Sequence, residues 1–225
     1  MRPKKLVAVL ALCTAGLLSG CAGLQPGVAA RVGEETISVQ DVNRITDGYC
    51  QAYEPQLESD GDTLTMEFLS SNILFRLALS SAARQLADDY GVEPTAAYVD
   101  NLATLRQTVS VLKPQAAEAR LAVDSSGTYV SDVLSTIGRQ QLAEDGVAEP
   151  TTEDSLARGQ DVMKRWLSDN EPEIDPQYGL VVDDLAPAFV DTSTSFAASD
   201  QAVAGAVRQP DPSYAASLPD SQRCG

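Results

Sequence analysis

The stretch ILFRLAL, residues 73–79, is apolar at six of its seven positions and contains no glycine or proline. Breaks occur before it at Asp60-Gly61-Asp62 and after it at Gly91, so we expect one long helix from about Thr63 to Tyr90. A helix whose middle is apolar on nearly every side is normally surrounded by other elements. The sequence therefore predicts a mainly α fold with this helix at the centre of a bundle.

Amphipathic patterns on both sides supply the helices that would surround this segment. Upstream, apolar residues recur every three or four positions from Val39 to Leu57, and Ser38 followed by Asp41 is typical of a helix start. Downstream, Pro114 should stop or kink the chain, because proline lacks the backbone N–H that a helix interior needs. The other expected elements are a helix over 94–112, a short helix over 115–123, a turn over 124–127 and helices over 129–143 and 150–167.

Two short segments depart from the helical pattern, and the end of the chain has no regular pattern. Residues 30–38 predict a strand, a turn at Gly33 and a returning strand, and residues 173–179 predict a short strand and a turn. The expected organisation is a signal peptide, a tether, a helical domain with a minor strand pair, and an irregular C-terminal tail. These parts correspond to residues 1–20, 21–29, 30–180 and 181–225.

The first residues have the pattern of an export signal. Three cations within the first five residues precede the apolar run Leu6–Leu18. This run is shorter than the ~20 helical residues that cross a bilayer, and a charged start followed by a short apolar run is typical of a signal peptide. The run ends in Leu18-Ser19-Gly20-Cys21, which resembles the bacterial lipobox.

The lipobox resemblance implies a lipid anchor. The thiol of Cys21 would carry a diacylglyceryl group with fatty acids such as palmitate, and the chain would be cut just before Cys21. The protein would then lie on the extracytoplasmic face of the cell membrane. The alternative is an ordinary secretory signal that ends near a cysteine.

The four cysteines divide into two groups. Cys13 would leave with the signal peptide and Cys21 would be lipidated, so Cys50 and Cys224 remain. An even pair of cysteines in an oxidising compartment predicts a disulfide, which would fasten the irregular tail to the helical domain. The alternative is two free thiols.

The chain is strongly acidic. It has 16 Lys and Arg against 32 Asp and Glu, and loss of residues 1–20 would remove three cations and no anion, leaving a net charge of about −19. Such a surface repels nucleic acid and anionic lipid headgroups. We therefore expect no nucleic acid partner and a body that is held away from the membrane surface.

The residue types argue against an enzyme. The chain has no histidine, which excludes a Ser-His-Asp triad, Cys-His catalysis and His-ligated zinc. It also lacks a phosphate-binding Gly-x-x-x-x-Gly-Lys loop. Ser110-Val111-Leu112-Lys113 matches a motif of penicillin-binding enzymes, but no Lys-Thr-Gly follows. We expect no cofactor, no metal and no enzymatic activity.

Three motifs in order resemble the N-terminal chaperone domain of the SurA and PrsA proteins, over residues 29–180. They are the strand and turn of residues 30–38 before a helix, the helix junction of residues 86–92, and the strand and turn of residues 174–179. The resemblance implies that the last of these strands returns to pair with Val32. It also implies chaperone-like binding of unfolded or extended polypeptides in an apolar cradle between helices.

The chain departs from these proteins in one respect. SurA and PrsA usually carry a parvulin isomerase domain between their helices and the returning strand, and only a short helical stretch occupies that place here. The resemblance therefore implies a chaperone without isomerase activity. The alternative is a structural or interaction lipoprotein that uses the same fold for one dedicated envelope partner.

Overall fold

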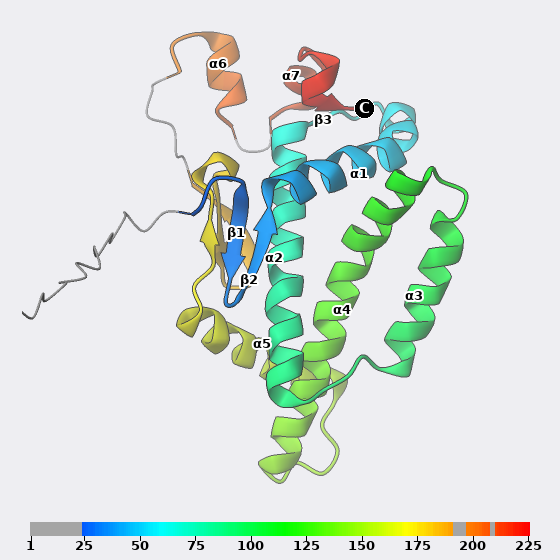
Figure 1. Ribbon diagram of the computed structural model, residues 1–225, viewed down its shortest axis with the longest axis vertical. Coiled ribbons are helices and arrows are strands. Elements are labelled where there is room, and N and C mark those ends of the chain that lie inside the picture. The colour runs from blue at the N-terminus through cyan, green and yellow to red at the C-terminus, as the bar shows by residue number, and fades with distance from the viewer. Residues whose placement is uncertain (1–23, 191–196, 208–209) are drawn as a thin grey trace, which may run out of the picture.

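A computed structural model describes residues 24–190, 197–207 and 210–225 (Figure 1). Most of these residues are helical, with a few short antiparallel strand pairs, which confirms the predicted mainly α fold with minor strands. In the described residues, no helix has both the length and the apolar character needed to cross a membrane. The five long helices are α1 (Val39–Asp60), α2 (Met66–Tyr90), α3 (Ala96–Val109), α4 (Pro114–Glu144) and α5 (Thr152–Asp169).

Helix α2 lies at the centre, as the apolar stretch predicts. The Thr65 side chain accepts a hydrogen bond from the backbone N–H of Phe68 at its start, and Gly91 ends it in the left-handed conformation with φ 62°. Ile73 and Leu74 are essentially inaccessible to solvent. In Figure 1, α1 crosses the upper end of α2, α4 lies beside it, and the strands β1 and β2 lie on its other side.

Helix α4 runs unbroken through residues 124–127, so the turn predicted there is wrong. Asp124 accepts hydrogen bonds from the hydroxyls of Tyr49 (3.1 Å) and Tyr53 (3.0 Å) of α1, and Arg120 on the preceding turn of α4 donates to it as well (3.1 Å). The Ser126 side chain is buried. These contacts with α1 outweigh the turn preference of the local residues. Sequence periodicity could not reveal them, because their partners lie 71 and 75 residues away.

Two glycines allow α4 and α5 to touch through their backbones. A Cβ atom on Gly138 would lie 1.8 Å from the carbonyl oxygen of Ser155, and one on Gly159 would lie 1.9 Å from the carbonyl oxygen of Leu134. Real Cβ atoms do not approach so closely, so only glycine permits this crossing. The contact belongs to the largest apolar cluster, which also contains Met163 of α5.

The strands at the start of the domain form a three-stranded antiparallel sheet in the order β2-β1-β4. β1 (Val28–Val32) pairs with β2 (Glu35–Ser38) across the turn at Gly33, as predicted. β4 (Glu173–Ile174) returns to the other edge of β1. Its partners are Ala30 and Arg31, so the strand implied by the SurA resemblance is present but pairs just beside Val32.

The tail is more regular than expected, so the prediction of an irregular tail is wrong for its described residues. One reason is local: the turn between β5 and β6 has Asp184 and Leu185 at positive φ, without the glycine or asparagine that usually marks such a turn. The other reason is remote pairing, since the last strand pairs with a strand near residue 64. The additional elements are β3 (Leu64–Thr65), η1 (Pro176–Tyr178), β5 (Leu180–Asp183), β6 (Ala186–Phe189), α6 (Asp200–Gly205), α7 (Pro212–Ala216), η2 (Asp220–Gln222) and β7 (Arg223–Cys224).

Candidate functional site

A cleft of about 470 Å³ lies where the N-terminal end of α2 meets the tail. Figure 1 shows the elements that carry its lining residues, among them the start of α2 and the helices α6 and α7, in the upper part of the molecule. Three parts of the chain line the cleft: the start of α2, the segment around η1 and β6, and the C-terminal segments. Its lining residues are Thr65, Met66, Glu67, Phe68, Ser71, Gln177, Tyr178, Gly179, Phe189, Val190, Gly205, Ala206, Val207, Pro210, Tyr214, Leu218, Ser221 and Gln222.

Local hydrogen bonds hold one side of the cleft rigidly on α2. The buried hydroxyl of Ser71 donates to the carbonyl oxygen of Tyr178 at 2.8 Å, which ties η1 to the first turns of α2. The Asp175 side chain accepts from the N–H of Gln177 (2.9 Å), and Gly179 ends η1 with φ 52°. Tyr178 is therefore fixed, with only 7% of its surface exposed.

Aromatic rings form much of the floor. Phe68 and Phe189 lie with ring centroids 6.1 Å apart and ring planes inclined by 35°. Burial, together with the nearby charge of Asp175, raises the pKa of Tyr178 above its usual value, so this ring stays neutral at physiological pH. Four of the twelve aromatic residues in the chain line this one cleft, the fourth being Tyr214. The lining also contains polar side chains, among them Thr65, Ser71 and Gln177, so the cleft combines aromatic rings with polar groups, as binding sites commonly do.

The charge on the described lining of the cleft is negative. Glu67 is the one charged residue among the described lining residues, and it is exposed at the start of α2. No lysine or arginine lines the described part of the cleft. In a chain with a net charge of −16, such a cleft disfavours an acidic ligand and accepts a neutral or basic one. The hydroxyls of Thr65 and Ser71 are used in a helix cap and a backbone hydrogen bond.

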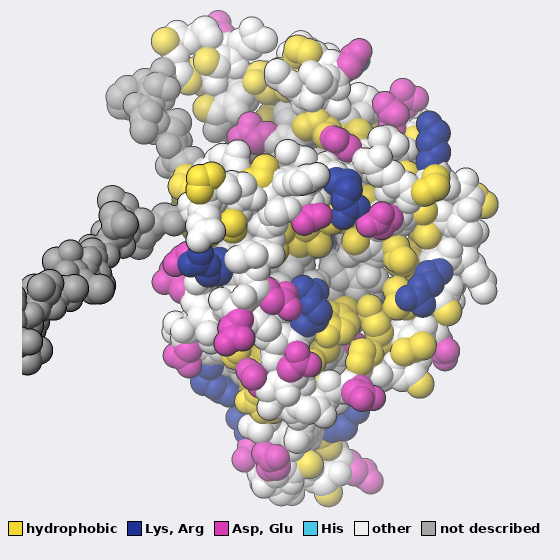
Figure 2. All heavy atoms as spheres, viewed as in Figure 1, with side chains coloured by type: hydrophobic (Ala, Val, Ile, Leu, Met, Phe, Trp, Pro, Cys, Tyr) yellow, Lys and Arg dark blue, Asp and Glu magenta, His cyan; other side chains and the backbone are white. Residues whose placement is uncertain are grey.

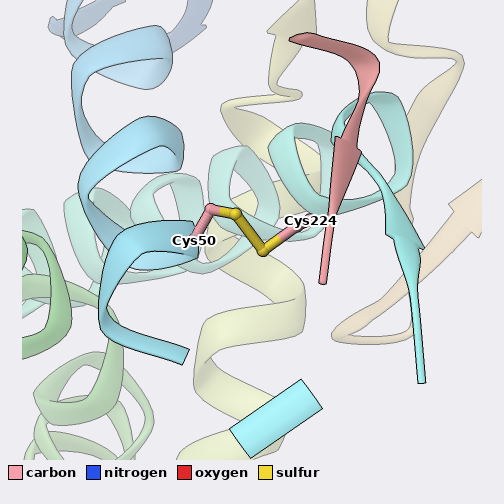
Figure 3. The surroundings of a disulfide bond; sticks show 2 residues. All are labelled: Cys50 and Cys224. Carbon is pink, nitrogen blue, oxygen red and sulfur yellow. A yellow bond between two sulfur atoms is a disulfide. The ribbon is translucent and has the colours of Figure 1, made fainter. Parts of the chain in front are cut away.

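The disulfide predicted from the cysteine count is present in the structure (Figure 3). The structure joins Cys50 of α1 to Cys224 of β7, with the sulfur atoms 2.11 Å and the Cα atoms 5.6 Å apart. Cys224 is 1% exposed and packs in an apolar cluster with Ile73. The bond fastens the end of the tail to the helical domain, two residues after the cleft residue Gln222.

The lipobox residues Leu18, Ser19, Gly20 and Cys21 lie outside the described residues. Lipidation of Cys21 therefore stays a prediction from the sequence.

The helix cradle implied by the SurA resemblance has a partial counterpart. Figure 2 shows apolar side chains gathered around a hollow below α1, on the face formed by α2, α3 and α4. Helix α3 is held there chiefly by α4: Tyr98 and Tyr129 meet edge to face with centroids 5.5 Å apart, and Val109 is the one fully buried residue of α3. Val99 of α3 is 50% exposed.

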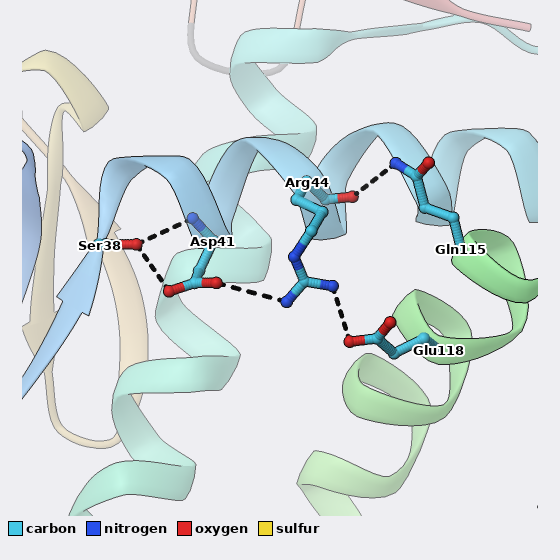
Figure 4. Close-up of polar contacts among 5 residues, drawn as sticks. All are labelled: Ser38, Asp41, Arg44, Gln115 and Glu118. Carbon is cyan, nitrogen blue, oxygen red and sulfur yellow. Dashed lines mark hydrogen bonds and ion pairs between the residues drawn. The ribbon is translucent and has the colours of Figure 1, made fainter.

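A polar network lies where α1 crosses the start of α4 (Figure 4). The guanidinium of Arg44 donates to Glu118 (2.7 Å) and to Asp41 (3.4 Å), and Gln115 donates to the carbonyl oxygen of Arg44 (3.4 Å). Ser38 caps α1 by accepting a hydrogen bond from the N–H of Asp41 (3.0 Å). The network joins α1 to α4, and its charges are exposed, so it contributes little to stability.

The cleft residues were missed by sequence reasoning, apart from the disulfide beside them. Phe68, Tyr178, Phe189 and Tyr214 come from distant parts of the chain, and no spacing rule connects them. The one available signal was the rarity of aromatic residues, which make up 5% of the chain.

In the described residues, no three His, Cys, Asp or Glu side chains gather into a group that could hold a metal ion. Comparisons of the chain with protein-family models, with curated proteins and with solved structures give no match.

Proposed function

We propose that this chain is a lipid-anchored lipoprotein of the cell envelope that binds apolar, extended segments of unfolded polypeptides in the cleft between α2 and the tail. It does so as a chaperone-like binder without isomerase activity. The observation that carries the proposal is the aromatic cleft itself, which has one acidic and no basic residue among its described lining residues.

The size and surface of the cleft suit one or a few apolar side chains. Its volume of about 470 Å³ lies within the range of pockets that enclose small ligands. Met66 and the Phe68–Phe189 pair provide adaptable, weakly directional contacts, which accept different apolar side chains. Binding of this kind is tolerant of sequence, as a chaperone requires.

Charge would then select among clients. Glu67 at the edge of the cleft favours lysine or arginine beside the apolar side chain, and the acidic body would keep the complex in solution. Apolar contacts are screened by salt much less than surface ion pairs, so binding should survive moderate salt.

The sequence motif supports the anchor. A diacylglyceryl group on Cys21 supplies two acyl chains, enough for stable attachment where one chain gives only marginal binding. The negative body would stand away from an anionic membrane surface and leave the cleft accessible.

The test is light scattering from a refolding protein, with the form that begins after Cys21 added at equimolar and tenfold excess. We expect wild type to suppress scattering and Phe68→Ala to do so roughly tenfold less well, since truncating a partly buried phenylalanine removes on the order of 1.5 kcal/mol of apolar contact. Val111→Ala is the matched control, because Val111 is 87% exposed in the α3–α4 connection and lies outside the cleft.

The outcomes separate the two functions considered for the chain. Unchanged scattering at both ratios, with far-UV circular dichroism showing a folded helical protein, would contradict the chaperone proposal and favour a dedicated envelope partner. If Phe68→Ala and Val111→Ala weaken the suppression of scattering equally, the cleft is not the site that binds the unfolded protein. Acceleration of prolyl isomerisation in the same refolding assay would contradict the absence of isomerase activity.

A further inference from the structure

One wall of the cleft comes from the last residues of the chain. Tyr214 of α7, Leu218, and Ser221 and Gln222 of η2 face the aromatic floor from the C-terminal side. The floor belongs to α2, η1 and β6, and β6 pairs with β5 in the first part of the tail. The cleft therefore has this wall only while the C-terminal segment stays in place.

The C-terminal segment contacts the body through several small areas. Its elements are very short: five residues in α7, three in η2 and two in β7. Helices and strands of this length are not stable alone. The segment contacts the body through the two-residue pairing of β7 with β3, the buried side chains of Ala215 and Cys224, contacts of α7 with β3 and of η2 with α2, and the close fit of Gly225 against Asp62 and Leu57.

The side-chain hydrogen bonds of the segment join residues within the segment. Arg223 donates to the carboxylate of Asp220 (2.7 Å) and to the carbonyl oxygen of Ala216 (3.4 Å), both within the segment. In residues 197–207 and 210–225, every described side-chain hydrogen bond and ion pair joins two residues of the tail itself. The covalent bond between Cys50 and Cys224 is therefore the strongest link between this wall and the body.

We propose that the Cys50–Cys224 disulfide is a redox latch for the cleft: the oxidised chain has a complete cleft, and reduction releases the C-terminal wall. The proposal rests on the proposed function for the identity of the ligand. Reduction requires a dithiol reductant, which supplies two electrons. The Cys50–Cys224 bond breaks, two protons complete the thiols, and the reductant becomes a disulfide.

The structure predicts a local effect of reduction. Opening the bond frees a connection that spans 174 residues, so the wall regains the conformational freedom that the bond had removed. The side of the floor formed by α2 and η1 stays, because Ser71 fastens Tyr178 to α2 without using any residue of the tail. The latch would leave the cleft incomplete in a reducing compartment and complete it after export to an oxidising one.

The experiment uses the full chain in neutral detergent micelles. Hydrogen–deuterium exchange reports the wall, and fluorescence anisotropy reports binding of a labelled Lys-Leu-Phe-Leu-Lys peptide. In Cys50→Ser, in Cys224→Ser and in wild type reduced by a dithiol, we expect at least tenfold faster exchange in residues 212–225, unchanged exchange in α2, and at least tenfold weaker peptide binding. A dithiol should change neither readout in the Cys50→Ser/Cys224→Ser double variant.

Each outcome decides one claim. Equal protection of residues 212–225 in oxidised and reduced wild type overturns the latch, whatever the peptide does. Faster exchange with unchanged peptide binding shows that the wall is not part of the binding site and also overturns it. If the oxidised protein fails to bind the peptide while the wall opens on reduction, the proposed function fails and the latch survives. Reduced wild type decides the question even if a serine variant misfolds.

Discussion

A Gly138→Ala substitution should strongly destabilise the protein, although alanine is the better helix former. Gly138 lies inside α4 at its crossing with α5, and an added methyl group would lie 1.8 Å from the carbonyl oxygen of Ser155 and 2.7 Å from the amide nitrogen of Gly159. Both neighbours are backbone atoms, so no side chain can rotate away. The two helices would have to separate, which would loosen the apolar cluster around Ile137 and Met163.

Gly127 is a matched control in the same helix. An added methyl group there meets only the end of the Arg76 side chain at 3.7 Å, an ordinary contact, and the site is exposed. Gly127→Ala should therefore stabilise the protein by about 0.8–1 kcal/mol through helix propensity alone. At Gly138 the same gain is opposed by overpacking, which typically costs about 1–3 kcal/mol and more when backbone must move.

The gain in helix propensity is common to both variants, so the difference between their free energies of unfolding equals the overpacking cost, about 1–3 kcal/mol. Because the clash is with backbone, we expect this cost to exceed the gain and the two variants to change stability with opposite signs relative to wild type. Urea denaturation followed by circular dichroism measures the difference, provided that the slope with denaturant is the same for all three proteins. Thermal unfolding should give differences of about 2–4 °C for each kcal/mol. If Gly138→Ala is as stable as Gly127→Ala, α4 and α5 do not cross in backbone contact and the described packing is wrong.

Three further predictions concern the termini and the first helix. Cys21→Ala should release the protein from membranes or leave it uncleaved, and unchanged fractionation with a mature N-terminus elsewhere would refute lipidation. Thiol labelling of the processed, denatured and unreduced protein should find neither Cys50 nor Cys224 free, and full labelling of both would contradict the disulfide. In the chain-entropy model, loss of this disulfide should lower the free energy of unfolding by up to about 5 kcal/mol. The Ser38 hydroxyl donates a hydrogen bond to the Asp41 carboxylate (2.6 Å) and lowers its pKa; burial opposes this effect in part and Arg44 adds to it. The ionised Asp41 therefore stabilises the fold above about pH 4, and this stabilisation is lost as the pH falls through the lowered pKa of Asp41 in the folded protein. Asp41→Asn should thus lower the free energy of unfolding at pH 7 and match wild type in strong acid, and a pH-independent difference in urea denaturation would contradict this.

The helical core could be predicted because its signals are local. The apolar stretch at residues 73–79, the Gly91 stop and the Ser38 cap each act within one or two helical turns, and the observed α2 begins three residues after the predicted Thr63. The turn expected at residues 124–127 failed because tyrosine hydroxyls from another helix stabilise Asp124 in a helix. Local preference is a weak guide where remote contacts satisfy the polar groups.

Of the features at the site, only the disulfide could be predicted from the sequence, because few cysteine pairings were possible. Elimination left Cys50 and Cys224 as the one remaining cysteine pair, and the structure joins them. The cleft depends instead on which distant segments meet, and the strand pairing that places β7 beside β3 involves only two residues on each side. No periodicity of two or 3.6 exists in so short a segment, so the aromatic floor and its wall became visible only in three dimensions.

Photo-crosslinking from the cleft tests the central claim most directly. Benzoylphenylalanine at position 177 places the reactive group in the cleft lining, where Gln177 lies, and the same residue at position 99 places it on the exposed face of α3. The purified lipoprotein is irradiated with unfolded lysozyme whose thiols have been blocked by carbamidomethylation, a basic client that cannot exchange with the Cys50–Cys224 disulfide. We predict several times more adduct from position 177 than from position 99; equal adduct, or none from position 177, would contradict binding of unfolded polypeptide in the cleft.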